Sequence, residues 1–199
     1  MWTRGNGRPS AIATRSSPPP KALPGYRPCG FHSPYEAAAW CVLSQRTRVP
    51  VAARLRRDLI VAHGNDGVFP APDALIRAID AEELDLPGRK PEYLRAVAKA
   101  ALTGLLNGPR LRTMPEESAR RDLLTVTGIG PFATDLILIR GANAQDILPR
   151  AERRLYAEIS YQYGPDSVLE EVAERWRPFR SWAAVHLRAL REQRTREMG

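Results

Sequence analysis

The stretch DLLTVTGIGPFATDLILIRGANAQDILPRAERRLY, residues 122–156, joins three apolar helical runs through a glycine turn and a short loop. The glycine turn is Thr127-Gly128-Ile129-Gly130. Pro131 follows it at a position that suits the first residue of a helix, where a missing N–H costs nothing. Two glycines around one apolar residue allow another molecule to approach the backbone closely. Free N–H groups at such a helix start favour an anion, so the turn is a candidate phosphate site. An ordinary turn between two helices is the alternative.

Helical periodicity continues on both sides of this stretch. Ser33, followed three residues later by Glu36, is typical of a capping box at a helix start. Apolar residues then recur at spacings of three and four, as in Val51, Leu55 and Leu59. The predicted helices are 33–45, one that starts at residue 50, 72–79, 90–105, 115–126, 131–140, 151–163, 167–176 and 179–194, with turns at 64–67, 87–88, 107–109 and 164–165. No alternating apolar run is long enough for a sheet, so the predicted fold class is all-α.

Composition and charge divide the chain into a basic tail and one helical domain. The 199 residues suffice for one core of ordinary size. Residues 1–32 are rich in Pro, Ser, Gly and Arg and contain no acidic residue, which is typical of a mobile tail, so the helical domain is predicted over 33–194. Lys and Arg number 30 against 22 Asp and Glu, and the resulting net charge of +8 fits a polyanionic partner.

Other patterns argue against several classes of protein. Cys29 and Cys41 are too few for a disulfide framework or a four-cysteine cluster, so both are predicted to be plain thiols in a reducing cytoplasm. His32, His63 and His186 have no Cys or carboxylate at ligand spacing, which argues against a metal hydrolase. We expect no transmembrane helix, because no run of 18 apolar residues occurs. We expect no signal peptide either, because the basic N-terminus lacks an apolar segment.

The glycine turn and its flanking helices resemble the helix-hairpin-helix of the DNA glycosylase superfamily of that name. Four more blocks are similar, in the same order, to blocks of the bacterial 3-methyladenine glycosylase II family: 34–45, 86–90, 146–149 and 174–182. The similarity covers about residues 33–190. It implies the helical part of that family's fold without its N-terminal sheet domain, double-stranded DNA as partner, and no cofactor beyond a possible structural Na⁺ or K⁺.

The resemblance implies a role for the hairpin backbone. The N–H groups of Gly128, Gly130 and Ala133, around Ile129, would bind a DNA phosphate. The carbonyls that would hold the monovalent cation are those of Leu124, Val126 and Ile129.

The resemblance also implies that the loop after the first helix fills the gap left by a flipped base. That loop begins at Gln45, and Arg46 occupies the position of the inserted side chain. An arginine can stack on bases and pair with phosphates, whereas a leucine only fills space. The alternative is that Arg46 and Arg48 are solvated surface charges that touch phosphate.

Chemistry on a base inside a duplex requires the base to leave the stack and enter a pocket that holds an acid. Counting from the 146–149 block places Glu152 where the family carries its catalytic aspartate. Leu155 and Ile159 put Glu152 on the apolar face of its predicted helix. Desolvation would raise its pKa, while the helix N-terminus and nearby arginines would lower it, so we expect it to be ionised. Such a carboxylate can stabilise an oxocarbenium-like sugar and orient the attacking water.

Two alternatives accompany this assignment. Glu152 could be a first-turn glutamate that only favours the helix dipole. Asp146 is a rival acid, although its place before a proline-bearing loop is more typical of a structural cap.

The resemblance further implies the reaction type and the base pocket. Relatives that also cut the strand carry a lysine two residues after the second hairpin glycine, where this chain has Phe132. Without an amine there is no Schiff base, so base removal alone is implied. The implied pocket residues are Trp40, Phe132, Leu136 and Arg188. Two of these are not aromatic, and Arg188 would repel a cationic base, which stacks best on aromatic rings. Core packing is the alternative for Trp40.

The sequence therefore predicts a cytoplasmic, nucleoid-associated monomer that acts as a monofunctional DNA glycosylase. It would flip an alkylated base and hydrolyse the N-glycosidic bond with Glu152 as the acid. One alternative is a non-catalytic DNA protein that binds lesions or unusual structures and has lost the aspartate. A second is a helical scaffold whose basic tail binds nucleic acid without specificity.

Overall fold

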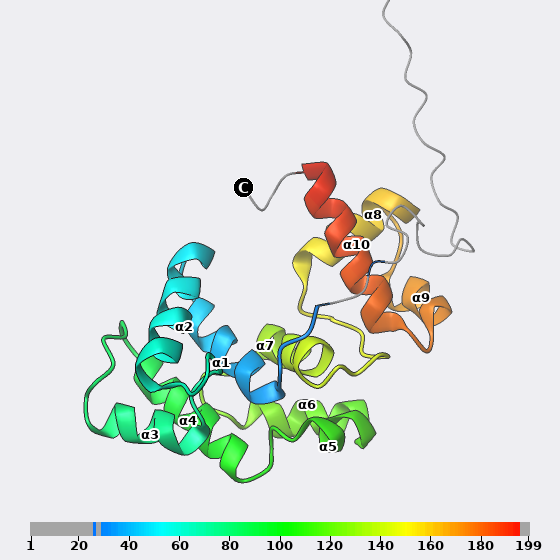
Figure 1. Ribbon diagram of the computed structural model, residues 1–199. Helices are drawn as coiled ribbons and strands as arrows, with labels where there is room; N and C mark the ends of the chain where they lie inside the picture. Colours follow the sequence, from blue (N-terminus) through cyan, green and yellow to red (C-terminus); the bar gives the residue numbers. More distant parts are fainter. Residues whose placement is uncertain (1–25, 27–28, 196–199) are drawn as a thin grey trace, which may run out of the picture.

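The computed structural model describes Tyr26 and residues 29–195 of the chain. Most of the predicted tail over residues 1–32 lies outside the described residues. Every regular element within the described ranges is helical, apart from one isolated bridge between Asn65 and Val68 (Figure 1). The all-α prediction is confirmed. None of the described helices is long and apolar enough to cross a membrane.

The helices follow one another with short connections. They are α1 (Pro34–Ser44), α2 (Val49–His63), α3 (Pro72–Asp80), α4 (Lys90–Leu102), α5 (Gly108–Thr113), α6 (Glu116–Leu124), α7 (Pro131–Leu136), the π-helical turn η1 (Ile137–Gly141), α8 (Arg153–Tyr163), α9 (Leu169–Ala173), the 3₁₀ turn η2 (Glu174–Trp176) and α10 (Arg180–Thr195). At the start of α1, Ser33 accepts a hydrogen bond from the backbone N–H of Glu36, as the capping pattern predicts.

Some predicted boundaries are wrong. Residues 107–109 were predicted as a turn, but helix α5 begins there. Asn107 caps it by accepting a hydrogen bond from the N–H of Arg110 at 2.9 Å, and Pro109 occupies a first-turn position that needs no N–H. The predicted helix 131–140 changes from α-helical to π-helical at Ile137, and the predicted helix 167–176 is divided into α9 and η2.

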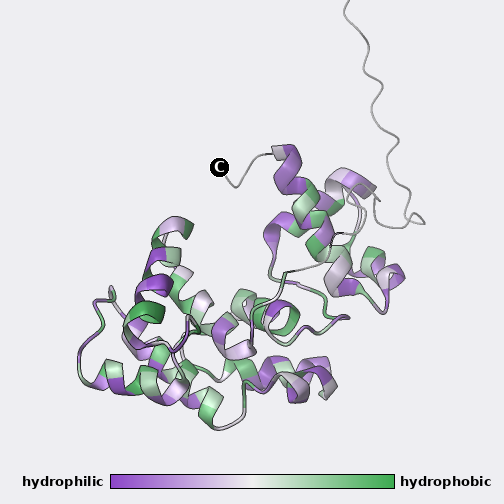
Figure 2. Ribbon diagram, in the orientation of Figure 1, coloured by the Kyte–Doolittle hydropathy of each residue, from purple (hydrophilic) through white to green (hydrophobic). Residues whose placement is uncertain are grey.

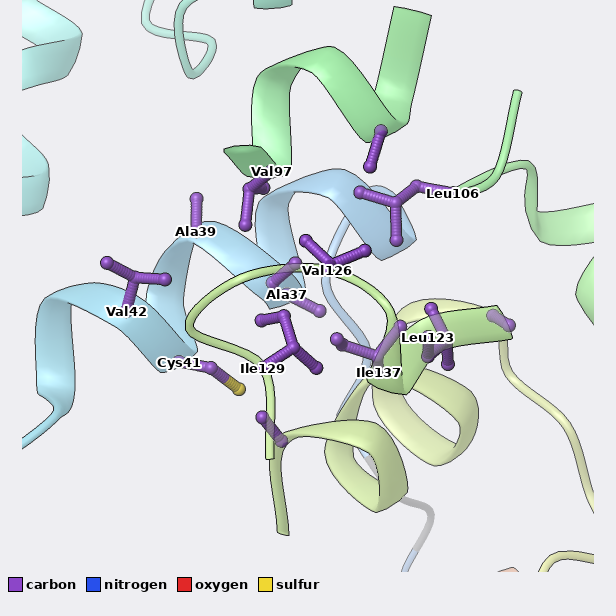
Figure 3. Close-up of a cluster of buried hydrophobic side chains, with 14 of the residues drawn as sticks. Ala37, Ala39, Cys41, Val42, Val97, Leu106, Leu123, Val126, Ile129 and Ile137 are labelled. Atoms are coloured by element: carbon purple, nitrogen blue, oxygen red, sulfur yellow. The ribbon is translucent and has the colours of Figure 1, made fainter. Parts of the chain in front are cut away.

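The larger core surrounds α1, which is buried on almost every side. Ala37, Ala38 and Leu43 are fully buried, so this helix lacks the polar face of a surface helix. Small residues let the backbones come close: a Cβ at Gly141 would lie 2.8 Å from Cα of Pro34. Figure 3 shows side chains of α1 together with others from α4, from η1 and from the turn that follows α6. The central helix of the fold therefore packs directly against the turn after α6.

A second core joins α8, α9 and α10. Leu155, Ile159 and Leu187 are almost completely buried in it, and Trp176 is also buried there. Figure 2 shows hydrophobic and hydrophilic residues alternating along α10, as expected for a helix that buries one face. In Figure 1, α7 lies between the larger group of helices and the α8–α10 group.

Candidate functional site

The turn between α6 and α7 contains two glycines, and the packing and backbone conformation of the protein require only the first of them. Gly128 has a φ of +91°, and a Cβ on it would lie 2.5 Å from Cγ of Tyr93. Gly130 is extended, with φ −107° and ψ −177°, and a Cβ on it would meet no atom within 4 Å. Gly128 is thus required by the fold, whereas nothing within the described protein requires glycine at position 130.

The hairpin presents backbone donors that the described part of the chain does not use. Within that part, the N–H groups of Gly128, Gly130 and Ala133 have no hydrogen-bond acceptor. Ile129 differs from them, because its N–H donates to the carbonyl of Val126 at 3.0 Å and its side chain is buried (Figure 3). Ile129 therefore anchors the turn to the core, and its neighbours carry the free donors. A cluster of such donors at a helix start suits an anion.

The hairpin carbonyls fit a monovalent cation in their chemistry. Hard cations are bound by oxygen ligands, and a carbonyl keeps a second lone pair after it accepts one hydrogen bond. The carbonyl of Val126 accepts one such bond, and those of Leu124 and Ile129 accept none from backbone N–H groups of the described residues.

The loop after α1 is attached to the hairpin and to α4. Gln45 Nε2 donates to the carbonyl of Gly128 at 2.7 Å. Lys90 is buried, and its Nζ donates to three carbonyls at the end of α1, at 2.8, 2.9 and 2.9 Å. Burial lowers the pKa of Lys90 below its ordinary value. No role was predicted for Lys90 from the sequence, because its acceptors are backbone carbonyls more than forty residues away.

Arg46 lies at the tip of this loop with a φ of +50°. Together with Thr47, Arg89 and Tyr93 it lines an open groove of about 530 Å³, and Arg48 follows as an exposed side chain. Arg46 thus follows directly after Gln45, which is bonded to the hairpin, and both arginines are exposed to solvent.

A pocket of about 190 Å³ lies between the α7–η1 segment and α10, and the loop before α8 closes one side. It is lined by Tyr26, Phe132, Asp135, Leu136, Ile139, Arg140, Pro149, Glu152, Val185, Arg188, Ala189 and Glu192. The predicted residues Phe132, Leu136, Glu152 and Arg188 thus come together in it. Trp40 does not line this pocket, and its ring packs at 6.5 Å from that of Phe31. The structure therefore does not bring Trp40 together with the other predicted pocket residues.

Glu152 is the N-cap of α8. The prediction that it lies within the helix is wrong. Its backbone is extended, with φ −92° and ψ 91°, so its side chain turns back over the first turn and accepts a hydrogen bond from the N–H of Arg154 at 3.0 Å. Its other carboxylate oxygen lies 3.2 Å from Nε of Arg188, and the side chain is 17% exposed. Because the helix starts two residues later than predicted, Glu152 faces α10.

Arg188 does not bring an uncompensated positive charge into the pocket. Its guanidinium lies between Glu152 and Glu192, whose Oε1 is 2.5 Å from Nη2. Two carboxylates therefore flank one cation, which removes the repulsion predicted for a cationic base. The third nitrogen, Nη1, is buried and has no hydrogen-bond partner within the described chain.

Asp135 lines the same pocket but was not predicted from the sequence. It is buried, with Oδ1 at 2.5 Å from Nη1 of Arg120 and Oδ2 at 3.0 Å from the N–H of Ala151. Burial raises its pKa above the ordinary value, although Arg120 opposes that shift. The available signal was a carboxylate inside the apolar run FATDLILI.

Asp146, the rival acid, is held away from this pocket in a network of arginines. Its carboxylate accepts from Arg177 at 2.6 Å and from Arg180 at 2.8 Å. Arg180 is buried and also donates to the backbone carbonyl of Asp146. Asp146 thus ties the η1–α8 connection to the start of α10, which is a structural role.

Comparisons with known proteins find no family model that matches. The DNA-3-methyladenine glycosylase of Bacillus subtilis is 24% identical over 185 residues, which cover 85% of this chain and 61% of the relative. DNA-3-methyladenine glycosylase 2 of Escherichia coli is 29% identical over 175 residues, covering 83% of this chain and 61% of the relative. The chain thus spans about three fifths of the length of these two relatives. DNA-3-methyladenine glycosylase 1 of Schizosaccharomyces pombe is 26% identical and is covered to 78%.

Solved structures show the same fold. The DNA-3-methyladenine glycosidase of Bacillus halodurans superposes with a TM-score of 0.71 at 18% identity, over 86% of this chain and 82% of that one. The S. pombe 3-methyladenine DNA glycosylase, solved in complex with abasic DNA, gives 0.64 at 24% identity, over 81% of this chain and 84% of that one.

Proposed function

We propose that this chain, a member of the helix-hairpin-helix DNA glycosylase superfamily similar to the 3-methyladenine DNA glycosylases, removes an alkylated base from double-stranded DNA. The observation that carries the proposal is the pocket beside the hairpin, which brings Glu152, Arg188 and Phe132 together from three segments of the chain. The names of the relatives support the substrate class.

DNA binding would use the hairpin and the loop after α1. The free N–H groups of Gly128, Gly130 and Ala133 would hold one phosphate, and the net charge of +8 favours the duplex in general. Arg46, which follows the hairpin-bound Gln45, would fill the space that the flipped base leaves. A Na⁺ or K⁺ held by the carbonyls of Leu124, Val126 and Ile129 would offset part of the phosphate charge.

Glu152 would supply the chemistry. Its carboxylate is held in place by the Arg154 N–H and by the Arg188 guanidinium. As the bond between C1′ and the base nitrogen breaks, the base leaves with the electron pair and positive charge develops on the sugar. The carboxylate stabilises this charge, and the attacking water transfers a proton to it.

No lysine lines the pocket within the described chain, and Phe132 occupies the position where strand-cutting relatives carry one. Without an amine no Schiff base forms, so hydrolysis would leave an intact abasic strand. The exposed ring of Phe132 and the two carboxylates that flank Arg188 both suit a cationic alkylated base.

A DNA-binding protein without catalysis is the second candidate. The observation that favours it is that both oxygens of Glu152 already have partners, one in the helix cap and one in the ion pair with Arg188. On this reading Glu152 is structural and the pocket only recognises a lesion.

Base release from alkylated duplex DNA separates the two candidates. Abasic sites are converted to strand breaks by alkali, and wild type is compared with Glu152→Gln, which keeps an oxygen for the cap but loses the charge. Glu170→Gln, an exposed change on α9, is the matched control. The proposal expects release by wild type and by the control, and its loss in Glu152→Gln with DNA binding retained. Release by Glu152→Gln at the wild-type rate would refute the role of Glu152, and no release by wild type would leave the binding protein.

A further inference from the structure

The loop that leads to Glu152 is held at two points by one buried ion pair. Arg120 of α6 donates from Nη2 to the carbonyl of Leu148 at 2.8 Å and from Nη1 to Asp135 at 2.5 Å. Asp135 of α7 in turn accepts from the N–H of Ala151 at 3.0 Å. The two contacts grip the backbone on both sides of Pro149, and the second lies one residue before Glu152.

Burying this ion pair has a desolvation cost that the stability of the fold does not require. The side chain of Asp135 is 5% exposed and that of Arg120 is 12% exposed, so both charges are largely removed from water. Apolar residues of similar volume often replace such a pair without loss of stability. What apolar residues cannot do is donate to a carbonyl and accept from an N–H three residues apart. What this pair provides and an apolar pair could not is therefore a fixed position of the loop backbone.

The side chain of Glu152 has a separate constraint, its ion pair with Arg188. A carboxylate acts on a reacting sugar only from a defined position, and a displacement of about 1 Å can cost on the order of 100-fold in rate. Since Glu152 sits at the end of a loop and caps a helix, its position depends on the backbone that precedes it.

We propose that Arg120 and Asp135 are positioning residues that fix the backbone of the acid-bearing loop so that Glu152 faces the pocket. This proposal rests on the proposed function, because its effect on rate requires that Glu152 acts. Asp135 lines the pocket, but one oxygen faces Arg120 and the other faces the N–H of Ala151, so it acts through the loop.

The decisive variant is Arg120→Met with Asp135→Leu, which keeps the space filled and removes the hydrogen bonds to Leu148 and Ala151. Its thermal midpoint is expected to fall, because the carbonyl of Leu148 and the N–H of Ala151 lose their partners, so release is measured at a temperature where the variant is folded. Its single-turnover rate of base release is expected to fall about 10- to 100-fold. Its affinity for the same DNA should stay within about threefold of wild type. A structural role would change the midpoint and not the rate of the folded protein. Either single change, Arg120→Met or Asp135→Leu, should slow release to a similar degree, because the pair acts as one unit.

Amide hydrogen exchange supplies a readout that does not depend on activity. Exchange at Ala151 and Arg154 should be faster in the double variant than in the wild type. Glu36→Gln alters a buried carboxylate of α1 that is paired with Arg56 of α2 and does not line the pocket, so it should leave that exchange and the release rate unchanged.

Release at the wild-type rate by the folded double variant would overturn the proposal, as would unchanged exchange at Ala151. Loss of release in Asp135→Leu with full release in Arg120→Met would also overturn it, because Asp135 would then be a reacting acid. If the wild type releases no base, the proposed function fails, and exchange at Ala151 still decides whether the pair holds the loop.

Discussion

Replacing Gly130 by alanine should weaken DNA binding without harming the fold. A Cβ at this position meets no atom within 4 Å, and the extended backbone of Gly130 is one that alanine adopts freely. Gly-to-Ala changes at compatible positions stabilise proteins by about 0.4–1 kcal/mol. The new methyl group, however, would stand in the open space beside the hairpin N–H groups, where a phosphate oxygen would have to come.

The expected loss follows from the contact that is blocked. A hydrogen bond to a charged group contributes about 1.5–3 kcal/mol, so losing one would raise Kd roughly 10- to 100-fold. Because an N–H group releases no counterion, the salt dependence of binding should keep its slope. Fluorescence anisotropy with a labelled duplex at several salt concentrations measures both quantities, and urea unfolding measures stability.

Gly128→Ala provides the contrast. Its left-handed φ costs an alanine about 1–2 kcal/mol, and the clash with Tyr93 adds about 1–3 kcal/mol. This variant should be destabilised, so weak DNA binding by it would say nothing about phosphate. Wild-type affinity in a folded Gly130→Ala would refute the phosphate site, and unfolding of Gly130→Ala would refute the packing on which the reasoning depends.

Three further predictions concern other parts of the molecule. An arginine in the gap can also pair with a phosphate, so Arg46→Gln should lower the magnitude of the salt slope of DNA binding by about 0.9. Arg77→Gln on α3 should not lower it, and equal slopes for the two variants would contradict the placement of Arg46. Lys90→Met should lower the free energy of unfolding by about 3 kcal/mol in urea titrations, because three carbonyls at the end of α1 lose their donor. Burial raises the pKa of the Cys41 thiol to about 12, so a thiol reagent at pH 8 should label Cys29 alone in the native protein and both cysteines in denaturant. Near pH 9 the Cys41 thiol loses its proton in the unfolded protein but keeps it in the native protein. The free energy of unfolding should therefore fall between pH 9 and 12, and it should fall less in Cys41→Ala.

Local signals in the sequence predicted the scaffold because their causes are local. The Ser33 cap, the glycine turn and the proline at the start of α7 each depend on residues within a few positions of one another. The same kind of signal failed at Asn107-Gly108-Pro109, which was predicted as a turn but starts helix α5. Asn and Pro occur both in turns and at helix starts, and only the residues that follow distinguish the two.

The supports of the candidate site could not be predicted because their partners are distant and are mostly backbone atoms. Lys90 binds carbonyls 45 to 48 residues away, and Arg120 binds one 28 residues away. A carbonyl has no signature in the sequence, since every residue carries one. Glu152 was found by its distance from a motif. Its predicted place within the helix was wrong, because the start of α8 depends on the hydrogen bond from Ala151 to Asp135 and on the Glu152 cap itself.

One ion pair acts on the side chain of Glu152 and another on the loop before it, and together they would let a glutamate serve in the proposed role. Arg188 acts on the side chain, where it balances the charge and draws the carboxylate toward the pocket. Arg120 and Asp135 act on the backbone and limit where the side chain can start. A glutamate has one more rotatable bond than an aspartate, so it loses more entropy when it is held in one place. Constraints at both ends of the side chain reduce that disadvantage. If one of them is removed, the carboxylate still caps α8 but no longer has a single position against the sugar, so base release should be lost before stability.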